Sequence, residues 1–389
     1  MGRFIKRMQE ALQKGDKVLL LLCLVATAFG CLMISSTTNA MGFTRYLVIQ
    51  SGAAILGIGC YILMSSVDAE FFSEHRRALV IINISLVLLL IPFGSDNGTG
   101  NKSWLNFPFL PIDIQPAEIC KITIVLILAS VMASHQNRPS NVWSVMHAAL
   151  HAGLLVGANY VISGDAGVSL IFVFIFLGMA FAGGISFMWF LGGIGGIALL
   201  APVVWQFMAP YQRLRIEVLF NPELDPFGTG ARYHTVRSLR SLTGGGLTGQ
   251  GLFNGNRTQT RGALFAQHTD YIFSAIGEEL GYIGCFLVLV LLFLIIARCI
   301  WVGNRSQDYM RRMICFGAAA VLIFQVISNV GMCIGVTPVI GLTLPFISYG
   351  GSSIVTLYAM LGLVSGVYAR PAPKSHERYI RAPLSSVYH

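Results

Sequence analysis

Charged residues are scarce in this chain of 389 residues: Asp, Glu, Lys and Arg make up only 11% of it, whereas 55% of the residues are hydrophobic. The mean hydropathy is +0.70. A soluble fold of this size could not bury so much apolar surface. The composition therefore excludes an ordinary soluble domain and predicts a polytopic membrane protein.

Motifs of several common chemistries are also missing. The sequence has no P-loop, no H-E-x-x-H helix and no cluster of metal-ligating residues, so neither nucleotide hydrolysis nor a dedicated metal centre is indicated. Its cysteines form no C-x-x-C pair and lie in or beside apolar runs, as expected of small core residues. They are Cys23, Cys31, Cys60, Cys120, Cys285, Cys299, Cys315 and Cys333. The net charge of +9 partly reflects cytoplasmic anchoring and requires no nucleic-acid partner.

Ten apolar runs are long enough to cross roughly 30 Å of hydrocarbon. They lie near residues 18–38, 46–66, 78–95, 115–134, 143–161, 166–183, 187–208, 271–298, 312–335 and 350–369. No internal repeat of fixed period is visible. We therefore expect an all-α integral membrane protein, one polytopic domain over residues 1–389, with about ten transmembrane helices and a large outward-facing loop between spans 7 and 8.

Lys and Arg residues near the ends of the spans predict the orientation. They recur on one side of the membrane: Arg3, Lys6, Arg7, Lys14, Lys17, Arg76, Arg77, Arg138, Arg298, Arg305, Arg311, Arg312, Arg370, Lys374, Arg378 and Arg381. By the positive-inside rule that side is cytoplasmic. Residues 1–17 are then a cytoplasmic amphipathic N-terminus, residues 370–389 a cytoplasmic tail, and residues 208–270 a large extracytoplasmic loop.

The loop of residues 208–270 is unusually basic for the outer side, because it holds seven arginines against four acidic residues. Short outer loops usually lack positive charge. Guanidinium groups bind phosphate oxygens well, so a lipid-linked phosphate or pyrophosphate is the expected ligand. Arg213 and Arg215 are the leading candidates to contact it.

Glu118 and Lys121 form a charged pair near the outer edge of a span. Pro116 suits a first helical turn, which makes the two residues i,i+3 neighbours about one turn inside the membrane boundary. Charges there must face a cavity or each other. The pair could therefore be self-neutralising and aid packing only, or line a functional cavity, which we favour. Trp104, in the preceding loop, could serve only as an interfacial anchor.

Two aspartates lie on the same outer side. Asp165 occupies a short turn between two spans, where a helix N-cap explains it as well as a functional site does. Asp270 stands where the polar loop meets the next span, and a partly desolvated carboxylate there can have the raised basicity of a general base. At least one of Glu278 and Glu279 must point inward, and we assign Glu279 to substrate binding.

Residues 335–353 mix Pro, Gly and aromatic residues at membrane depth. Irregular backbone is tolerated there only against protein or a wet cavity. We expect this segment to form one wall of an outward-facing cleft, with Ser352 among the substrate-binding residues.

Three motifs resemble the SEDS family of shape, elongation, division and sporulation proteins, which includes RodA, FtsW and SpoVE. They are Ile114-Gln115-Pro116-Ala117-Glu118 with Lys121, His268-Thr269-Asp270 followed by Gly277-Glu278-Glu279-Leu280-Gly281, and Leu344-Pro345-Phe346-Ile347-Ser348-Tyr349-Gly350-Gly351-Ser352-Ser353. The resemblance covers essentially the whole chain. It implies a ten-span peptidoglycan glycosyltransferase of the bacterial cytoplasmic membrane that polymerises lipid II with a class B penicillin-binding protein as partner.

The resemblance also implies which residues are critical. The family's charged positions and its loop tryptophan correspond to Glu118, Lys121, Asp165, Asp270 and Trp104. The chain departs from the family pattern in three places. Ser103 stands where the family often has Arg, with Lys102 as a substitute; residues 163–167 keep only the aspartate and the final glycine; and the Pro-Glu pair that commonly precedes His268 is absent.

The reaction expected from these residues is glycosyl transfer between two lipid-linked disaccharides. The expected catalytic residues are Asp270, Glu118, Lys121 and Asp165, and the expected substrate-binding residues are Trp104, Lys102, Arg213, Arg215, Glu279 and Ser352. Mg²⁺ or Mn²⁺ could assist with the diphosphate, although no ligand set is apparent. The alternatives are a lipid II flippase, which would usually show repeats that this chain lacks, and a scaffold without chemistry. The short tail and residues 335–353 favour an elongation role over division or sporulation.

Overall fold

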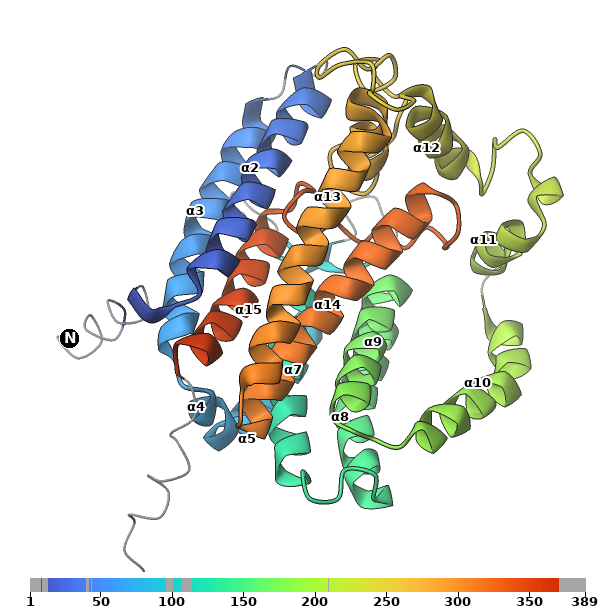
Figure 1. The fold of residues 1–389 in the computed structure, drawn as a ribbon. Coiled ribbons are helices and arrows are strands. Elements are labelled where there is room, and N and C mark those ends of the chain that lie inside the picture. Colours follow the sequence, from blue (N-terminus) through green and yellow to red (C-terminus); the bar gives the residue numbers. More distant parts are fainter. Residues whose placement is uncertain are drawn as a thin grey trace, which may run out of the picture.

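The computed structural model describes residues 8, 13–39, 42, 44–95, 101–106, 114–208 and 210–370. These residues form a bundle of long helices, covered at one end by the turns of residues 245–271 (Figure 1). We call this the loop end, and the opposite end, where α4 lies and α15 finishes, the tail end. The elements are α2 (Lys17–Asn39), α3 (Thr44–Ser66), α4 (Ala69–Glu74), α5 (Arg76–Leu88), α6 (Leu90–Phe93), β1 (Gly94–Ser95), β2 (Trp104–Leu105), α7 (Pro116–Ser134), α8 (Val142–Ser163), α9 (Ala166–Ala182), α10 (Phe187–Phe207), α11 (Pro210–Phe220), the 3₁₀ helix η1 (Pro222–Leu224), α12 (Tyr233–Gly244), α13 (Ile272–Arg305), α14 (Tyr309–Cys333) and α15 (Gly351–Ala369).

Eight described stretches of helix are long and apolar enough to cross a membrane. They are α2, α3, α5 with α6, α7, α8, α13, α14 and α15. α9 and α10 are also apolar, over the shorter stretches Ala166–Ala182 and Phe187–Val203. These helices coincide with the runs expected from the sequence, so the helical membrane fold is confirmed, while the number of ten crossings stays a prediction. The one sheet among the described residues is the short antiparallel pair β1–β2.

α7 lies inside the bundle and is covered on all sides. It begins at Pro116, whose missing N–H suits the first turn of a helix. In an apolar stretch of 18 residues of this helix, 83% of the residues are buried, because α5, α8, α9, α14 and α15 pack around it. A helix in such surroundings is expected to be apolar all round, so its buried Glu118 and Lys121 are the exceptions that require an explanation.

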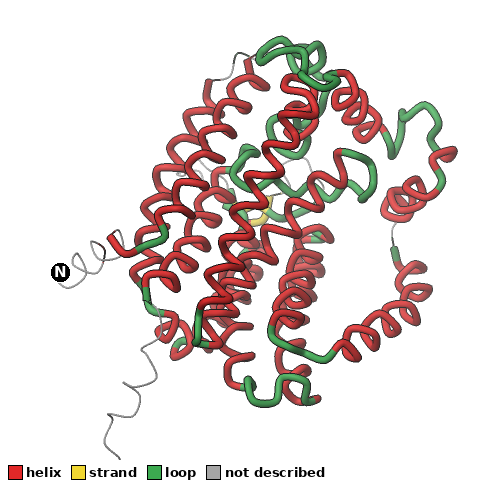
Figure 2. The backbone as a smooth tube through the Cα atoms, viewed as in Figure 1, coloured by secondary structure: helices red, strands yellow, loops and turns green. Residues whose placement is uncertain are grey.

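α10 lies in the opposite situation. It leans away from the other helices (Figures 1 and 2), and no side chain described in it is buried. Its glycines Gly192, Gly193, Gly195 and Gly196 would each accept a Cβ without any neighbour within 4 Å. Because α10 is apolar on every face, we expect it to be surrounded by lipid in a membrane.

Residues 208–270, expected from the sequence as a polar loop, contain α11, η1 and α12 and then fold back over the start of α13. Gly281 of α13 makes this close approach feasible. It has a φ of +68°, and a Cβ at this position would lie 2.4 Å from the backbone oxygen of Leu247. Only glycine fits both the backbone conformation and the space.

Glu278 and Glu279 hold these turns against α13, and both are buried. Oε1 of Glu279 accepts a hydrogen bond from Oγ1 of Thr258 at 2.7 Å, and its Oε2 accepts one from the amide of Phe253 at 3.3 Å. Oε1 of Glu278 accepts a hydrogen bond from the amide of Arg257. Contrary to the expectation that it binds substrate, Glu279 uses its carboxylate to fix the fold.

Asp16 joins three helices at the tail end. Its fully buried carboxylate forms an ion pair with Arg298 of α13, with Nε–Oδ2 and Nη2–Oδ1 distances of 2.7 and 3.0 Å. Oδ1 also accepts a hydrogen bond from the amide of Leu19 in α2, and the Asp16 amide donates to Oγ of Ser365 in α15. The Arg298 guanidinium stacks on the Trp301 ring at 4.1 Å. This set of contacts, which we call the tail-end latch, ties α2, α13 and α15 together.

Candidate active site

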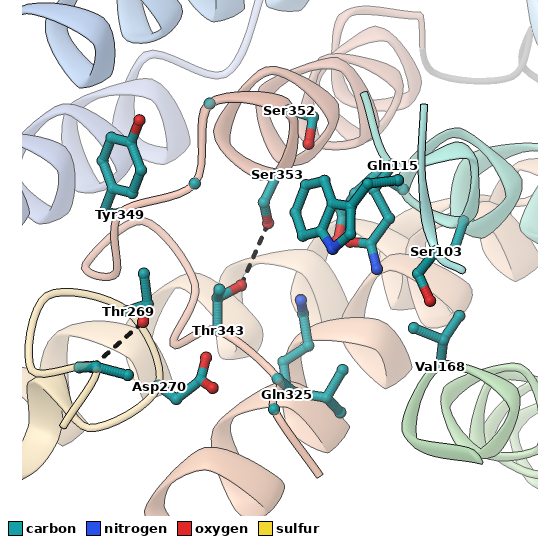
Figure 3. Close-up of a pocket in the computed structure, with 18 of the residues that line it drawn as sticks. Ser103, Gln115, Val168, Thr269, Asp270, Gln325, Thr343, Tyr349, Ser352 and Ser353 are labelled. Carbon is teal, nitrogen blue, oxygen red and sulfur yellow. Dashed lines mark hydrogen bonds between the residues drawn. The ribbon is translucent and has the colours of Figure 1, made fainter. Parts of the chain in front are cut away.

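A cavity of about 760 Å³ lies among the first turns of α3, α7, α9 and α15, beside α14 and the turn before α13. Its wall brings together residues that are far apart in the sequence, including Arg45, Trp104, Glu118, Lys121, Asp165, Asp270, Gln325 and Ser352. Figure 3 shows Asp270, Thr343 and Gln325 on one side of the cavity and Ser103 and Val168 on the other. All four charged positions expected to be critical therefore meet in one place.

Glu118 and Lys121 are both buried in the wall of this cavity, with exposed fractions of 7% and 5%. Nζ of Lys121 lies 2.8 Å from Oε1 of Glu118, and Oε2 of Glu118 accepts a hydrogen bond from Oγ1 of Thr356 at 2.9 Å. The pair thus neutralises itself and also borders the cavity, and its part in the chemistry stays a prediction. Thr356 on α15 fixes the carboxylate, which in turn fixes the ammonium group.

Asp165 is likewise both an N-cap and a residue of the cavity wall. Its Oδ1 accepts a hydrogen bond from the amide of Val168 at 3.0 Å, which caps α9. Its Oδ2 accepts one from Oγ of Ser103 at 3.1 Å. Ser103 precedes Trp104, whose strand β2 pairs with β1, so Asp165 holds this segment, and Trp104 with it, beside the cavity.

Asp270 precedes α13, outside the helices that could cross a membrane. Burial in the cavity wall, together with the negative charge of Asp165, raises the pKa of Asp270 from 3.8 to about 6. Neither of its carboxylate oxygens accepts a hydrogen bond from the part of the chain that the structure describes. The group is therefore a stronger base than an ordinary aspartate and remains open to a ligand.

Asn329 of α14, which the sequence did not single out, holds the backbone at Asp270. Its Nδ2 donates to the Asp270 carbonyl oxygen at 2.9 Å and to the Leu342 carbonyl oxygen at 2.7 Å. Sγ of Cys333, one turn further along α14, also lies 3.7 Å from the Asp270 oxygen. One face of α14 thus joins the turn that carries Asp270 to the irregular segment opposite.

That irregular segment forms a wall of the cavity, as the sequence predicted. Residues 336–350 contain no helix or strand. Oγ of Ser348 donates to the Thr269 carbonyl oxygen at 2.6 Å, and the Tyr349 amide donates to the His268 carbonyl oxygen at 2.8 Å. The segment is therefore fastened to the two residues that precede Asp270, and Ser352 follows it in the cavity wall.

Three basic residues expected at the site lie elsewhere. The Arg213 guanidinium donates to the carbonyl oxygens of Met208 and Gln206 at 3.0 and 2.6 Å, where α10 passes into α11. Arg215 lines a separate cavity of about 90 Å³ beside α12. Lys102 is exposed and is not part of the cavity wall. The basic character of residues 208–270 therefore does not supply the cations of this cavity.

Arg45, at the start of α3, is the cavity cation that the sequence reading missed. It forms no ion pair or hydrogen bond with the described residues. A lone arginine before an apolar run, on the side predicted to face outward, was the available signal. Gln325 in the middle of an apolar helix was missed in the same way. Among the described residues no group of three or more His, Cys, Asp or Glu could hold a metal ion, and a role for Mg²⁺ or Mn²⁺ stays a prediction.

Known proteins resemble this chain over nearly its whole length. The FtsW/RodA/SpoVE family model, described as "Cell cycle protein", matches residues 16–371. Peptidoglycan glycosyltransferase MrdB of Escherichia coli (strain K12) is 32% identical over 359 residues, which cover 91% of this chain and 93% of MrdB. The probable peptidoglycan glycosyltransferase FtsW of Thiomicrospira cyclica is 31% identical over 360 residues, which cover 90% of each chain.

Solved structures share the fold as well. A chain in "Structural coordination of polymerization and crosslinking by a peptidoglycan synthase complex" superposes with a TM-score of 0.76 and 29% identity, over 94% of this chain and 99% of that one. The rod shape determining protein RodA of Thermus thermophilus superposes with a TM-score of 0.68 and 26% identity, over 92% of this chain and 98% of RodA. The chain thus belongs to the FtsW/RodA/SpoVE, or SEDS, family and is a multi-pass bacterial membrane peptidoglycan glycosyltransferase.

Proposed function

We propose that this protein polymerises lipid II at the outer face of the cytoplasmic membrane, by glycosyl transfer from one lipid-linked disaccharide to another. The observation that carries the proposal is the meeting of Asp270, Asp165 and the Glu118–Lys121 pair in one cavity. The names of the relatives support the reaction class. The distribution of Lys and Arg supports an orientation with the loop end outside and both termini in the cytoplasm.

Asp270 acts as the general base in this reaction. Its carboxylate takes the proton of the acceptor sugar hydroxyl while that oxygen attacks the anomeric carbon of the donor. The bond from this carbon to the diphosphate oxygen breaks, undecaprenyl diphosphate leaves, and the configuration at the carbon is inverted. A pKa of about 6 keeps Asp270 ionised at neutral pH and brings its basicity close to the operating pH, as general-base catalysis requires.

Lys121 and Arg45 stabilise the charge that develops on the leaving diphosphate. Lys121 donates to Glu118 at 2.8 Å, which leaves further N–H groups for the cavity. Arg45 presents a guanidinium that the described residues leave unpaired. Cations placed in advance where negative charge grows lower the barrier without reorganisation. Arg45 thus replaces Arg213 and Arg215 in the role that the sequence suggested for them.

The expected partner is a class B penicillin-binding protein, which crosslinks the glycan that this protein makes. The similarity to a chain of a peptidoglycan synthase complex that coordinates polymerisation and crosslinking supports this pairing. We also propose the elongation role that residues 335–353 favour.

Purified protein, alone and with its penicillin-binding partner, tests the proposal when it is incubated with labelled lipid II and the products are resolved on a gel. The decisive variant is Asp270→Asn, which keeps the shape of the side chain and removes the base. Asp308→Asn is its matched control, because Asp308 caps α14 at the tail end, away from the cavity.

We expect a ladder of glycan polymers from the wild type and from Asp308→Asn, and none from Asp270→Asn, while all three proteins bind lipid II. Polymer made by Asp270→Asn would remove Asp270 as the base. No polymer from any sample with intact binding of lipid II would favour transport, which a vesicle translocation assay measures.

A further inference from the structure

Gln325 is a buried amide with an unused acceptor in the wall of the active-site cavity. It lies on α14 with an exposed fraction of 1%, and it lines the cavity together with Asp270. Its Oε1 is covered by protein and accepts no hydrogen bond from the residues that the structure describes, and its Nε2 donates none to them. Figure 3 shows it on the same side of the cavity as Asp270 and Thr343.

The fold gives no structural use to this oxygen, in contrast with Gln50, another buried glutamine. Nε2 of Gln50 donates to the Ser348 carbonyl oxygen at 3.3 Å, and its Oε1 accepts from the Gly350 amide at 3.1 Å. A buried acceptor without a donor lowers stability, and an apolar side chain of similar size would not. Because Gln325 borders a cavity, a ligand in that cavity can supply the missing donor.

The chemistry of the acceptor selects one part of the substrate. A diphosphate ionised at neutral pH offers oxygen acceptors and no hydrogen to donate, whereas a peptidoglycan disaccharide carries hydroxyl groups and acetamido N–H groups. We propose that Gln325 is a specificity-determining residue whose side-chain carbonyl accepts a hydrogen bond from a sugar hydroxyl or acetamido N–H of the lipid-linked disaccharide. The inference rests on the proposed function and names the part of the substrate that lies beside Asp270. Because Oε1 is covered in the structure, the amide must turn about the last torsion of the side chain, which is soft, to present this oxygen to the ligand.

The test compares two ligands that differ in the sugar. Lipid II and undecaprenyl diphosphate are titrated onto the full-length protein in nanodiscs, as wild type and as Gln325→Leu. We expect Gln325→Leu to bind lipid II about tenfold more weakly, the effect of one hydrogen bond at a desolvated site, and to bind undecaprenyl diphosphate within about twofold of the wild type. In the polymerisation assay the KM for lipid II rises by a similar factor and kcat changes little, because the contact is made in the ground state as well.

Thermal unfolding separates this role from a structural one. Gln325→Leu removes an unpaired polar group, so its Tm should equal or exceed that of the wild type, whereas Gln50→Leu breaks two hydrogen bonds and should lower the Tm. Unchanged lipid II binding by Gln325→Leu, equal weakening of both ligands, or a Tm as low as that of Gln50→Leu would overturn the inference. If the wild type makes no polymer, the proposed function fails while the ligand comparison still decides the role of Gln325.

Discussion

Two ion pairs are buried at opposite ends of this molecule, and their surroundings differ. In the tail-end latch, both oxygens of Asp16 bind Arg298, one of them also caps α2, and an aromatic ring covers the guanidinium. At the loop end, Lys121 has Glu118 as its one hydrogen-bond partner among the described residues, and the pair borders a cavity of about 760 Å³. The first pair is closed and complete, and the second is open.

This difference distinguishes a buried ion pair that stabilises the fold from one that can take part in chemistry. A buried pair whose hydrogen bonds are all made inside the fold joins elements and offers nothing to a ligand. A pair that faces a cavity keeps donors available for an incoming anion, at some cost in stability. Burial and charge alone would have made the two pairs equivalent, and only their partners distinguish them.

The largest effect on the free energy of unfolding is expected from breaking the tail-end latch. Asp16→Asn leaves Arg298 charged and largely buried without its partner, which should lower the free energy of unfolding by about 3–5 kcal/mol. Chemical denaturation in detergent measures this loss. The control is Glu70→Gln, because the Glu70 carboxylate pairs with Arg311 but is 76% exposed, and an exposed pair contributes little. Equal losses from the two variants would contradict the role of the latch.

Replacing the open pair should separate activity from stability. In the double variant Glu118→Gln/Lys121→Met both charges disappear together, so no unpaired charge is left behind and the unfolding free energy should stay near that of the wild type. The turnover should fall by about 10²–10³-fold, because the cation that we propose stabilises the leaving diphosphate is lost. Measurement of lipid II polymerisation and of unfolding on the same preparation checks both parts. A double variant that polymerises at the wild-type rate would show that the pair serves packing only.

Asn329→Leu should have a smaller and mixed effect. It removes the donor shared by the carbonyl oxygens of Asp270 and Leu342, which should lower the free energy of unfolding by about 1–3 kcal/mol. The protein that still folds should polymerise lipid II more slowly, because Asp270 is no longer held in position. The control is Asn141→Ala, which removes the N-cap of α8 at the tail end and should lower stability without slowing the folded enzyme. Equal turnover in the two variants would argue against a positioning role for Asn329.

The smallest expected effect comes from pH. Because the folded state raises the pKa of Asp270 to about 6, polymerisation should fall about tenfold for each pH unit below that value, as the base becomes protonated. The linked stability has the opposite sign: between pH 3.8 and about 6 the folded state binds the extra proton, so this residue's contribution to stability rises as the pH falls. A pH–rate profile of the wild type checks the first statement. A flat profile down to pH 5 would exclude Asp270 as the titrating base.

The sequence predicted the helices and the charged residues that meet in the cavity for related reasons. The length of an apolar run predicts a membrane-spanning helix directly. Charges such as Glu118, Lys121 and Asp270 stand out because charged residues are costly at the membrane edge. The predictions that the structure does not support concern the hydrogen-bond partners of single side chains. Arg213 and Glu279 carry charges that suit a substrate, but local backbone groups and folded-back turns use them. A pattern of residue types cannot show which distant segment folds over a side chain.

The comparison of the two ends is tested most directly by Asp270→Asn and Asp16→Asn, measured together for lipid II polymerisation and for thermal unfolding. Asp270→Asn should make no polymer and should unfold at or above the wild-type temperature, because it removes a carboxylate that burial disfavours in its charged form. Asp16→Asn should unfold at a lower temperature and still polymerise lipid II in its folded fraction. Polymer from Asp270→Asn, or a folded Asp16→Asn without activity, would contradict the separation of chemistry at the loop end from structure at the tail end.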